Sequence, residues 1–284
     1  MRAKGLAALI ALTAVWGTTF PTIKVVVSRV GFAYYVALRF GLATLILLPL
    51  ALTRKEQLRR NMRWGALLGA LYFGGITLQG WGMEYTTASN AAFVTGLSVV
   101  IVFALEVALG REKPSARLVS AIALALAGLY MMSFSGSAYK AMLGDLIVLA
   151  GSFFWALQII AVDRAASGDL YSLLFLESFF TALGASLVAP ATRSLTATEV
   201  VAVLPPLVYL ATVCTIGANA LQLYGQRYVR SVVAALIYLL EPVFAAAFSC
   251  AALGEAVRAD QAAGAALILA SMTVSSLRAE RTLS

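Results

Sequence analysis

The 284-residue chain contains no histidine, only two cysteines and few charged residues. Without histidine it lacks the side chain that titrates most readily near neutral pH, so carboxylates are left as candidate proton carriers. Cys214 and Cys250 lie within apolar runs and have no metal-ligand spacing, which argues against a zinc site or a disulfide framework. Charged residues make up 12% and apolar residues 61% of the chain, whereas soluble domains carry about 25% and about 45–50%. The composition therefore excludes a water-soluble globule.

Long apolar runs fill most of the sequence. A membrane-spanning helix needs roughly 20 mostly apolar residues, so the chain has room for about ten spans and for no sizeable domain outside the membrane. The first run, 5–22, is too long for a signal-peptide core and lacks its cleavage site, so we interpret it as the first span. We expect the longest connection of the second half at 191–203. The predicted fold is an all-α integral membrane protein with ten transmembrane helices, near 5–24, 32–52, 64–83, 90–109, 118–134, 144–162, 170–190, 204–225, 232–252 and 260–277.

The basic residues indicate the orientation of these spans. If the N-terminus is cytoplasmic, fifteen of the 21 Lys and Arg residues fall on the cytoplasmic side, in clusters such as 54–63 and 111–117. Only five fall on the outer side, and Arg39 lies within a span. Because positive charge is enriched in cytoplasmic loops, we predict a multi-pass protein of the cell inner (cytoplasmic) membrane with both termini in the cytoplasm.

The two halves of the chain resemble each other. Pairs that match at a shift of 143 residues, or of 139 near the start of each half, include Gly74 and Gly217, Gln79 and Gln222, Glu112 and Glu255, and Trp16 and Trp155. Apolar sequences align with one another easily, but the pairing of rare Trp, Gln and Glu residues favours a true repeat. Each half holds five helices, an odd number, so the second half enters the membrane from the opposite side. We therefore predict two inverted repeats, 1–137 and 138–284, an arrangement common among secondary transporters.

Several motifs also resemble those of a known family. They are WGTTF at 16–20, Arg39 in the second helix, GWGMEYTTASNAAFV at 80–94 and LEPVFAAAFSCAALGE at 240–255. Together with the two five-helix halves, these motifs resemble the drug/metabolite transporter superfamily, specifically its EamA-domain exporters, over essentially the whole chain. The resemblance implies export of amino acids, other metabolites or drugs, with the exporters of aromatic amino acids as the nearest likeness. The first half has Val99 where the second half has Pro242, so whether both segments bend alike is left open.

Polar and aromatic side chains within the spans are the candidates for recognising a solute, because apolar side chains alone only exclude water. They form stripes on single helices: Thr13, Trp16 and Thr19; Tyr72, Gln79 and Met83; Ser152, Trp155 and Gln158; and Thr215, Asn219, Gln222 and Gln226. Aromatic rings would supply flat apolar walls, and amides and hydroxyls could hold an amino-acid head group. We predict a substrate site where helices 1, 3, 6 and 8 meet, formed by Trp16, Thr19, Tyr72, Gln79, Trp155, Gln158, Asn219, Gln222 and Tyr238.

These stripes have a structural alternative, because small and polar side chains also join helices within membranes. We favour the lining role for the Trp and Gln pairs, and helix packing for Thr13, Ser152 and Thr215. Three further aromatic residues are expected in a belt at the membrane interface: Trp81, Tyr34 and Tyr35.

Four charged residues fall within predicted spans: Arg39, Glu106, Glu177 and Glu241. A buried charge is costly, so it normally has a partner or faces water. Glu241 precedes Pro242, which removes a backbone donor, and this makes Glu241 the main candidate for coupling or gating, together with Arg39. The alternatives for Glu241 are a buried ion pair with Arg39 or a position near an aqueous mouth. Glu106 is expected to be solvated by the basic residues that follow it.

These observations predict a secondary transporter that works by alternating access and exports amino acids. The expected amino acids are aromatic or hydrophobic, and related small metabolites or drugs are expected substrates as well. A passive facilitator or channel is the alternative. A membrane-embedded lipid-modifying enzyme is disfavoured, because the sequence has no histidine, no clustered Asp/Glu motif, no G-x-S-x-G and no phosphate-binding Gly-Lys loop. We expect no enzymatic activity, no cofactor and no metal. The expected partners are a small-molecule substrate and the lipid bilayer, not nucleic acid, and a monomer is compatible with the sequence.

Overall fold

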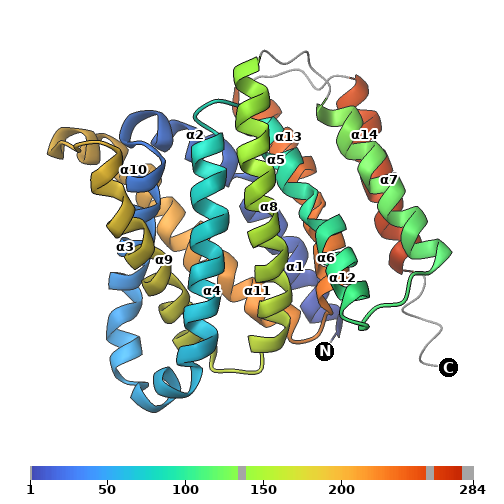
Figure 1. The fold of residues 1–284 in the computed structure, drawn as a ribbon. Coiled ribbons are helices and arrows are strands. Elements are labelled where there is room, and N and C mark those ends of the chain that lie inside the picture. The colour runs from blue at the N-terminus through green and yellow to red at the C-terminus, as the bar shows by residue number, and fades with distance from the viewer. Residues whose placement is uncertain (1, 134–138, 254–258, 277–284) are drawn as a thin grey trace.

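A computed structural model describes residues 2–133, 139–253 and 259–276, and every regular element in these ranges is helical. The helices run side by side as a bundle (Figure 1). Their bounds are α1 Arg2–Gly17, α2 Thr19–Val30, α3 Phe32–Leu52, α4 Lys55–Gly82, α5 Ala88–Gly96, α6 Ser98–Ala108, α7 Ala116–Ser133, α8 Tyr139–Ala165, α9 Leu170–Thr192, α10 Ala197–Ala211, η1 Thr212–Gly217, α11 Ala218–Gln226, α12 Ser231–Tyr238, α13 Leu240–Leu253 and α14 Ala259–Ser276.

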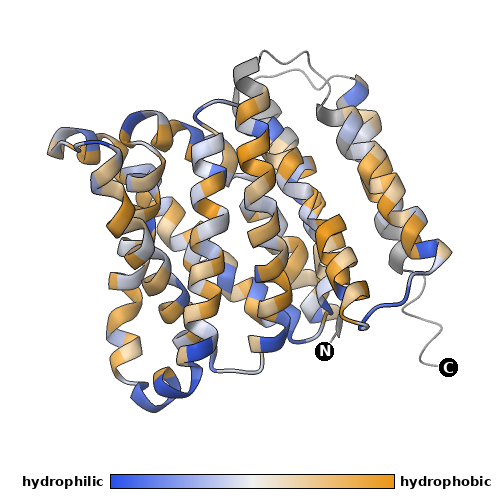
Figure 2. Cartoon of the chain, viewed as in Figure 1, coloured by the Kyte–Doolittle hydropathy of each residue, from blue (hydrophilic) through white to orange (hydrophobic). Residues whose placement is uncertain are grey.

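The chain is a multi-pass membrane protein. Large apolar side chains face outward, with Leu187 76% and Val201 67% exposed, and a water-soluble surface does not carry many such residues. Hydrophobic residues fill the middle of the helices, while hydrophilic residues gather at their ends (Figure 2). Among the residues that the structure describes, six helical segments are long and apolar enough to cross a membrane: Ala3–Val30, Phe32–Leu52, Asn90–Ala108, Met142–Ala165, Leu170–Thr192 and Ala197–Gln226.

Three of the long helical segments are interrupted at a single residue. Thr18 separates α1 from α2, Leu97 separates α5 from α6, and Leu239 separates α12 from α13. At each of these residues the backbone amide donates to the carbonyl three residues earlier, which is a tighter turn than that of an α-helix. The interruptions bring side chains of both flanking helices toward the middle of the bundle.

The two halves interrupt their helices near Val99 and Pro242 in the same way. Pro242 has no N–H, so the Tyr238 carbonyl lacks its α-helical donor, and α12 ends at Tyr238. Val99 has an N–H, yet α5 still ends at Gly96. The first half therefore has the same helix interruption although it has Val99 in place of a proline.

Close packing of α4 against α9 depends on glycine at two points. A Cβ atom on Gly65 would lie 2.3 Å from the Cβ of Leu176, and one on Gly69 would lie 2.5 Å from the Cβ of Phe180. These contacts bring α4 against α9, which also packs along α3, while α4 lies against α8 and α1 against α11. The pair α7 and α14 stands at one edge of the bundle (Figure 1).

The predicted long connection at 191–203 is wrong. The α9 helix continues to Thr192 and α10 begins at Ala197. A capping box explains the early start: the Thr196 side chain accepts from the Glu199 amide, and Glu199 accepts from the Thr196 amide. The expected interface position of Tyr35 is also wrong, because its side chain is fully buried, whereas Trp81 is exposed and stacks on the ring of Phe32.

Candidate functional site

A cavity lies among the interrupted helices. Nine of the eleven residues predicted for substrate binding or coupling line it: Trp16, Thr19, Arg39, Tyr72, Gln79, Trp155, Gln158, Tyr238 and Glu241. The structure thus brings together side chains from α1, α2, α3, α4, α8, α12 and α13 around one space. Mainly apolar walls with a few polar groups among them are typical of small-molecule sites.

Aromatic rings form two walls of the cavity. Trp155 meets Tyr72 edge-on, with ring centroids 4.8 Å apart and an interplanar angle of 86°. Trp16 meets Tyr238 with centroids 5.3 Å apart and an angle of 63°. Such edge-to-face pairs hold each ring in one orientation, so the apolar walls are preformed.

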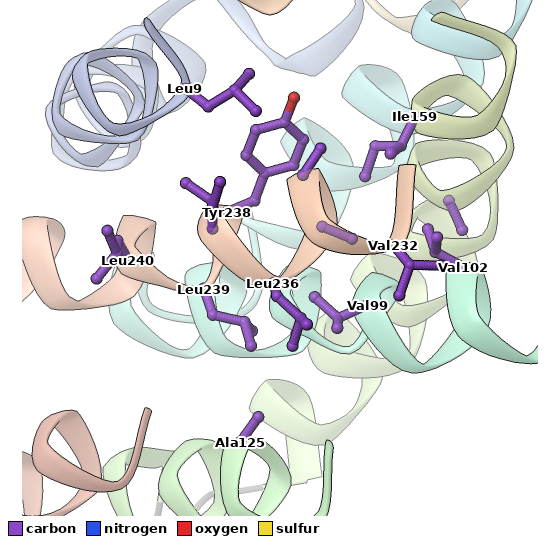
Figure 3. Close-up of a cluster of buried hydrophobic side chains, with 14 of the residues drawn as sticks. Leu9, Val99, Val102, Ala125, Ile159, Val232, Leu236, Tyr238, Leu239 and Leu240 are labelled. Carbon is purple, nitrogen blue, oxygen red and sulfur yellow. The ribbon is translucent and has the colours of Figure 1, made fainter. Parts of the chain in front are cut away.

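Tyr238 is held at both ends. Its ring lies between Leu9 and Ile159 in a cluster of buried apolar side chains (Figure 3). Its hydroxyl donates to Oε1 of Gln226 across 3.0 Å. Tyr238 therefore presents an apolar ring face to the cavity, while its polar end is bound elsewhere.

Trp155 leaves a polar atom without a partner. Its Nε1 is buried and makes no hydrogen bond to any described residue. An indole N–H can only donate, and a buried unpaired donor costs free energy. Trp155 therefore combines a ring on the cavity wall with a buried N–H that has no described partner.

Arg39 is a buried cation held by neutral groups. Its Nη1 donates to the Tyr35 hydroxyl, its Nε to Thr215 Oγ1 at 2.7 Å and its Nη2 to the Cys214 carbonyl at 2.9 Å. A guanidinium has five N–H donors, so three hydrogen bonds leave donor capacity beside the cavity. The guanidinium is thus oriented but not neutralised by these partners.

Glu241 is the carboxylate on the cavity wall. No hydrogen bond or ion pair of this side chain involves a residue within the described ranges. The ion pair with Arg39 that we considered is therefore not formed, and Glu241 lines the cavity instead. An unpaired carboxylate at such a place attracts a cationic group or a proton.

Asn219 and Gln222 do not line the cavity but lie directly behind its wall. Gln222 and Gln158 bond each other reciprocally, at 3.0 and 3.2 Å. The Tyr72 hydroxyl donates to Asn219 Oδ1 across 3.3 Å. The prediction that the polar stripe of helix 8 faces the cavity therefore differs from the structure, in which α11 positions the lining residues Gln158 and Tyr72.

Comparison with known proteins shows to which family the chain with this cavity belongs. The sequence model of the EamA-like transporter family matches residues 3–134 and again residues 142–277. The chain belongs to the EamA-like transporter family. This membership points to a transporter rather than an enzyme, and to a small-molecule substrate for the cavity.

Relatives of this EamA-like transporter carry the same general description. An uncharacterized transporter of Archaeoglobus fulgidus is 33% identical over 275 residues, covering 95% of this chain and 84% of that protein. A second one from the same organism is 26% identical, with 87% and 89% covered. The uncharacterized transporter YyaM of Bacillus subtilis is 30% identical over half of each chain. A crystal structure that is 18% identical matches all of both chains with a TM-score of 0.79, which shows the same fold.

One wall of the cavity in this EamA-like transporter was missed by sequence reasoning. Thr95, Gly96, Ser98 and Val99 line it from the interruption between α5 and α6. The internal repeat carried the signal, because a shift of 143 residues places Thr95 opposite Tyr238 and Ser98 opposite Glu241.

For two buried glutamates, the sequence did not predict the surroundings that the structure shows. Glu106 was expected to be solvated, but it is 3% exposed and accepts from Ser231 Oγ at 3.0 Å. Glu177 was recognised as a charge within a span, and the structure places it between Gln158 and Asn219. Its partners were not predictable because they lie on other helices.

Hydrogen bonds and an ion pair join helices at both ends of the bundle. At one end, Lys24 Nζ donates to the carbonyls of Met83 and Thr86 and joins α2 to the connection after α4. At the other end, Arg54 and Asp169 form an ion pair of 2.7 Å between the connections α3–α4 and α8–α9. No group of metal-ligating side chains occurs in the ranges that the structure describes.

Proposed function

We propose that this EamA-like transporter exports amino acids with aromatic or hydrophobic side chains, and related metabolites or drugs, across the cytoplasmic membrane. The observation that carries the proposal is one cavity with both aromatic walls and unsatisfied polar groups. The rings of Trp16, Tyr72, Trp155 and Tyr238 suit a flat or apolar side chain. The unpaired Glu241 carboxylate suits an ammonium group.

The opposite end of an amino acid also finds partners in this cavity. A substrate carboxylate needs hydrogen-bond donors, and the Trp155 N–H and the remaining donors of Arg39 supply them. Gln79 adds an amide that bonds Thr95 Oγ1 at 3.1 Å across the cavity wall. The site thus offers groups of opposite charge for a zwitterion, beside walls for its side chain.

We further propose that ten transmembrane helices form two inverted five-helix repeats, 1–137 and 138–284, and that they rock against each other. The two matches to the family model, one in each half, support this division. Helix contacts support it as well, since α3 packs on α9 and α7 on α14, which are equivalent elements of the two halves. The contacts α4–α8 and α1–α11 are then a symmetry-related pair.

Cytoplasmic termini and outward transport complete the proposal. In Figure 1 the start of α1 and the end of α14 lie on the same side of the bundle as the turn between α3 and α4, where the basic cluster 54–63 begins. The excess of positive charge supports a cytoplasmic position for that side. Export, rather than import, rests on the resemblance to EamA-domain exporters.

Counterflow in proteoliposomes tests the proposal. Vesicles preloaded with unlabelled L-phenylalanine should take up labelled L-phenylalanine faster than empty vesicles, with saturation. Trp155→Ala and Gln222→Ala should reduce this exchange while the protein still reconstitutes. A flux that rises linearly with concentration and shows no counterflow would indicate a passive facilitator. Protection of growing cells against toxic amino-acid analogues would establish the outward direction.

A further inference from the structure

Glu177 is a carboxyl group buried in the middle of α9 with only neutral partners. Its side chain is 1% exposed. Gln158 Nε2 donates to its Oε1 at 3.1 Å, and Asn219 Nδ2 donates to its Oε2 at 3.2 Å. These donors come from α8 and α11, so the carboxyl group lies where three helices of the second half meet.

No cation compensates this carboxyl group among the residues that the structure describes. The α9 helix packs against α3, α4 and α11. From α3, Arg39 is engaged by Tyr35, Thr215 and the Cys214 carbonyl. The basic residues of α4, Lys55, Arg59, Arg60 and Arg63, are exposed near its start, and its Tyr72 turns its hydroxyl to Asn219.

The remaining helices bring no cation either. The polar groups that α11 presents are neutral amides, and Gln158, the donor from α8, is also an amide. Asp163, on the same helix as Gln158, accepts from the Ser231 amide farther along α8, and Arg164 beside it is exposed. A carboxylate enclosed in this way is stabilised by two hydrogen bonds only, and burial without a counter-charge favours its neutral form.

We propose that Glu177 is a proton-binding site that couples transport to the proton gradient. This inference rests on the proposed transport function, and it moves the coupling role from Glu241 to a group behind the cavity wall. Glu177 is a positioning and proton-carrying residue, because it does not line the cavity itself.

The hydrogen bonds around Glu177 provide the link to the substrate. When Glu177 binds a proton, one of its oxygens becomes a donor, so one of the two amides that now donate to it has to turn its oxygen toward it. A half-turn of Asn219 would take the acceptor away from the Tyr72 hydroxyl. A half-turn of Gln158 would change its reciprocal pair with Gln222.

Tyr72 and Gln158 both line the cavity, so either rearrangement alters the surface that a substrate meets. Proton binding and substrate binding therefore influence each other, and the influence is reciprocal by linkage. The described residues contain no cluster of three or more His, Cys, Asp or Glu side chains that could hold a metal ion.

The first test needs no substrate. Infrared difference spectra of the purified protein between acid and alkaline pH should contain a buried carboxyl C=O band that disappears in Glu177→Gln. Glu106→Gln is the matched control, because Glu106 is also buried and hydrogen-bonded but lies away from the cavity. Identical wild-type and Glu177→Gln spectra would overturn the proposal. So would a Glu177 carboxyl C=O band that remains in the absolute spectrum at alkaline pH, since it would indicate a permanently neutral acid.

The second test uses L-phenylalanine in proteoliposomes. An imposed pH gradient should drive accumulation by the wild type and by Glu106→Gln. Glu177→Gln should retain counterflow at equal pH, which also shows that it is folded, but should lose accumulation. If Glu177→Gln does not reconstitute, Glu177→Asp should accumulate substrate with a shifted pH dependence, and an unshifted dependence contradicts the proposal.

The two tests separate the two proposals. A wild type that exchanges L-phenylalanine but ignores the pH gradient contradicts proton coupling and leaves the transport function intact. A wild type that exchanges none contradicts the proposed substrate, while the infrared titration still decides whether Glu177 binds a proton.

Discussion

Arg39 Nε donates a hydrogen bond of 2.7 Å to Thr215 Oγ1, and this bond joins α3 to the π-helix η1. The wider turn of η1 lets Thr215 Oγ1 also donate to the carbonyl of Leu210, five residues earlier. Both side chains are almost fully buried. A local irregularity in one helix therefore serves to hold the buried cation of another.

Thr215→Val should destabilise the protein by about 1–3 kcal/mol, because it leaves a donor of a buried cation without its acceptor. The measurement is thermal or denaturant unfolding in detergent. Thr212→Val is the matched control within the same π-helix, since the Thr212 hydroxyl bonds only the carbonyl of Val208 and is partly exposed. Equal loss of stability in both variants would contradict a special role for the Arg39 contact.

Trp155→Phe should weaken substrate binding without reducing stability. The change removes an N–H that has no partner in the described protein and keeps an aromatic ring beside Tyr72. Loss of one hydrogen bond of about 1 kcal/mol raises the KM for L-phenylalanine about fivefold. Trp81→Phe, at an exposed ring stacked on Phe32, should leave the KM unchanged. An unchanged KM for Trp155→Phe would mean that the indole N–H does not contact the substrate.

Gly69→Val should destabilise the contact between α4 and α9. A Cβ atom at Gly69 would lie 2.5 Å from the Cβ of Phe180 and 2.9 Å from the Glu177 carbonyl, and overpacking of this kind costs about 1–3 kcal/mol or more. Gly41→Val is the control, because no atom lies within 4 Å of a Cβ built at Gly41. We expect a lower unfolding temperature and reduced yield for the first variant only, as measured in detergent.

Single cysteines should report the orientation of the bundle. In a chain with Cys214→Ala and Cys250→Ala, Gln57→Cys places a thiol in the exposed basic turn and Ser194→Cys places one near the opposite end. A membrane-impermeant maleimide added to intact spheroplasts should label the variant at position 194. The variant at position 57 should react only after the membrane is opened. The reverse pattern would place the termini outside.

The sequence by itself determined the class of the protein and singled out many of the side chains that line its cavity. The high share of apolar residues and the low share of charged ones indicated a membrane protein. In a bilayer every backbone polar group has to form its hydrogen bond within the protein, and apolar runs of this length do so as helices. The spacing of Trp16, Tyr72, Gln79 and Trp155 on single helices then marked residues that the structure brings to one cavity. These features are local, so periodicity and composition are sufficient to reveal them.

Only the tertiary structure decided which helix faces are turned to the cavity and which groups are paired. Asn219 and Gln222 lie behind the wall, and Arg39 binds neutral groups rather than Glu241. The partners of Glu177 were equally beyond a single sequence. Such pairings depend on the rotation of each helix about its axis, and the packing of several distant helices sets that rotation.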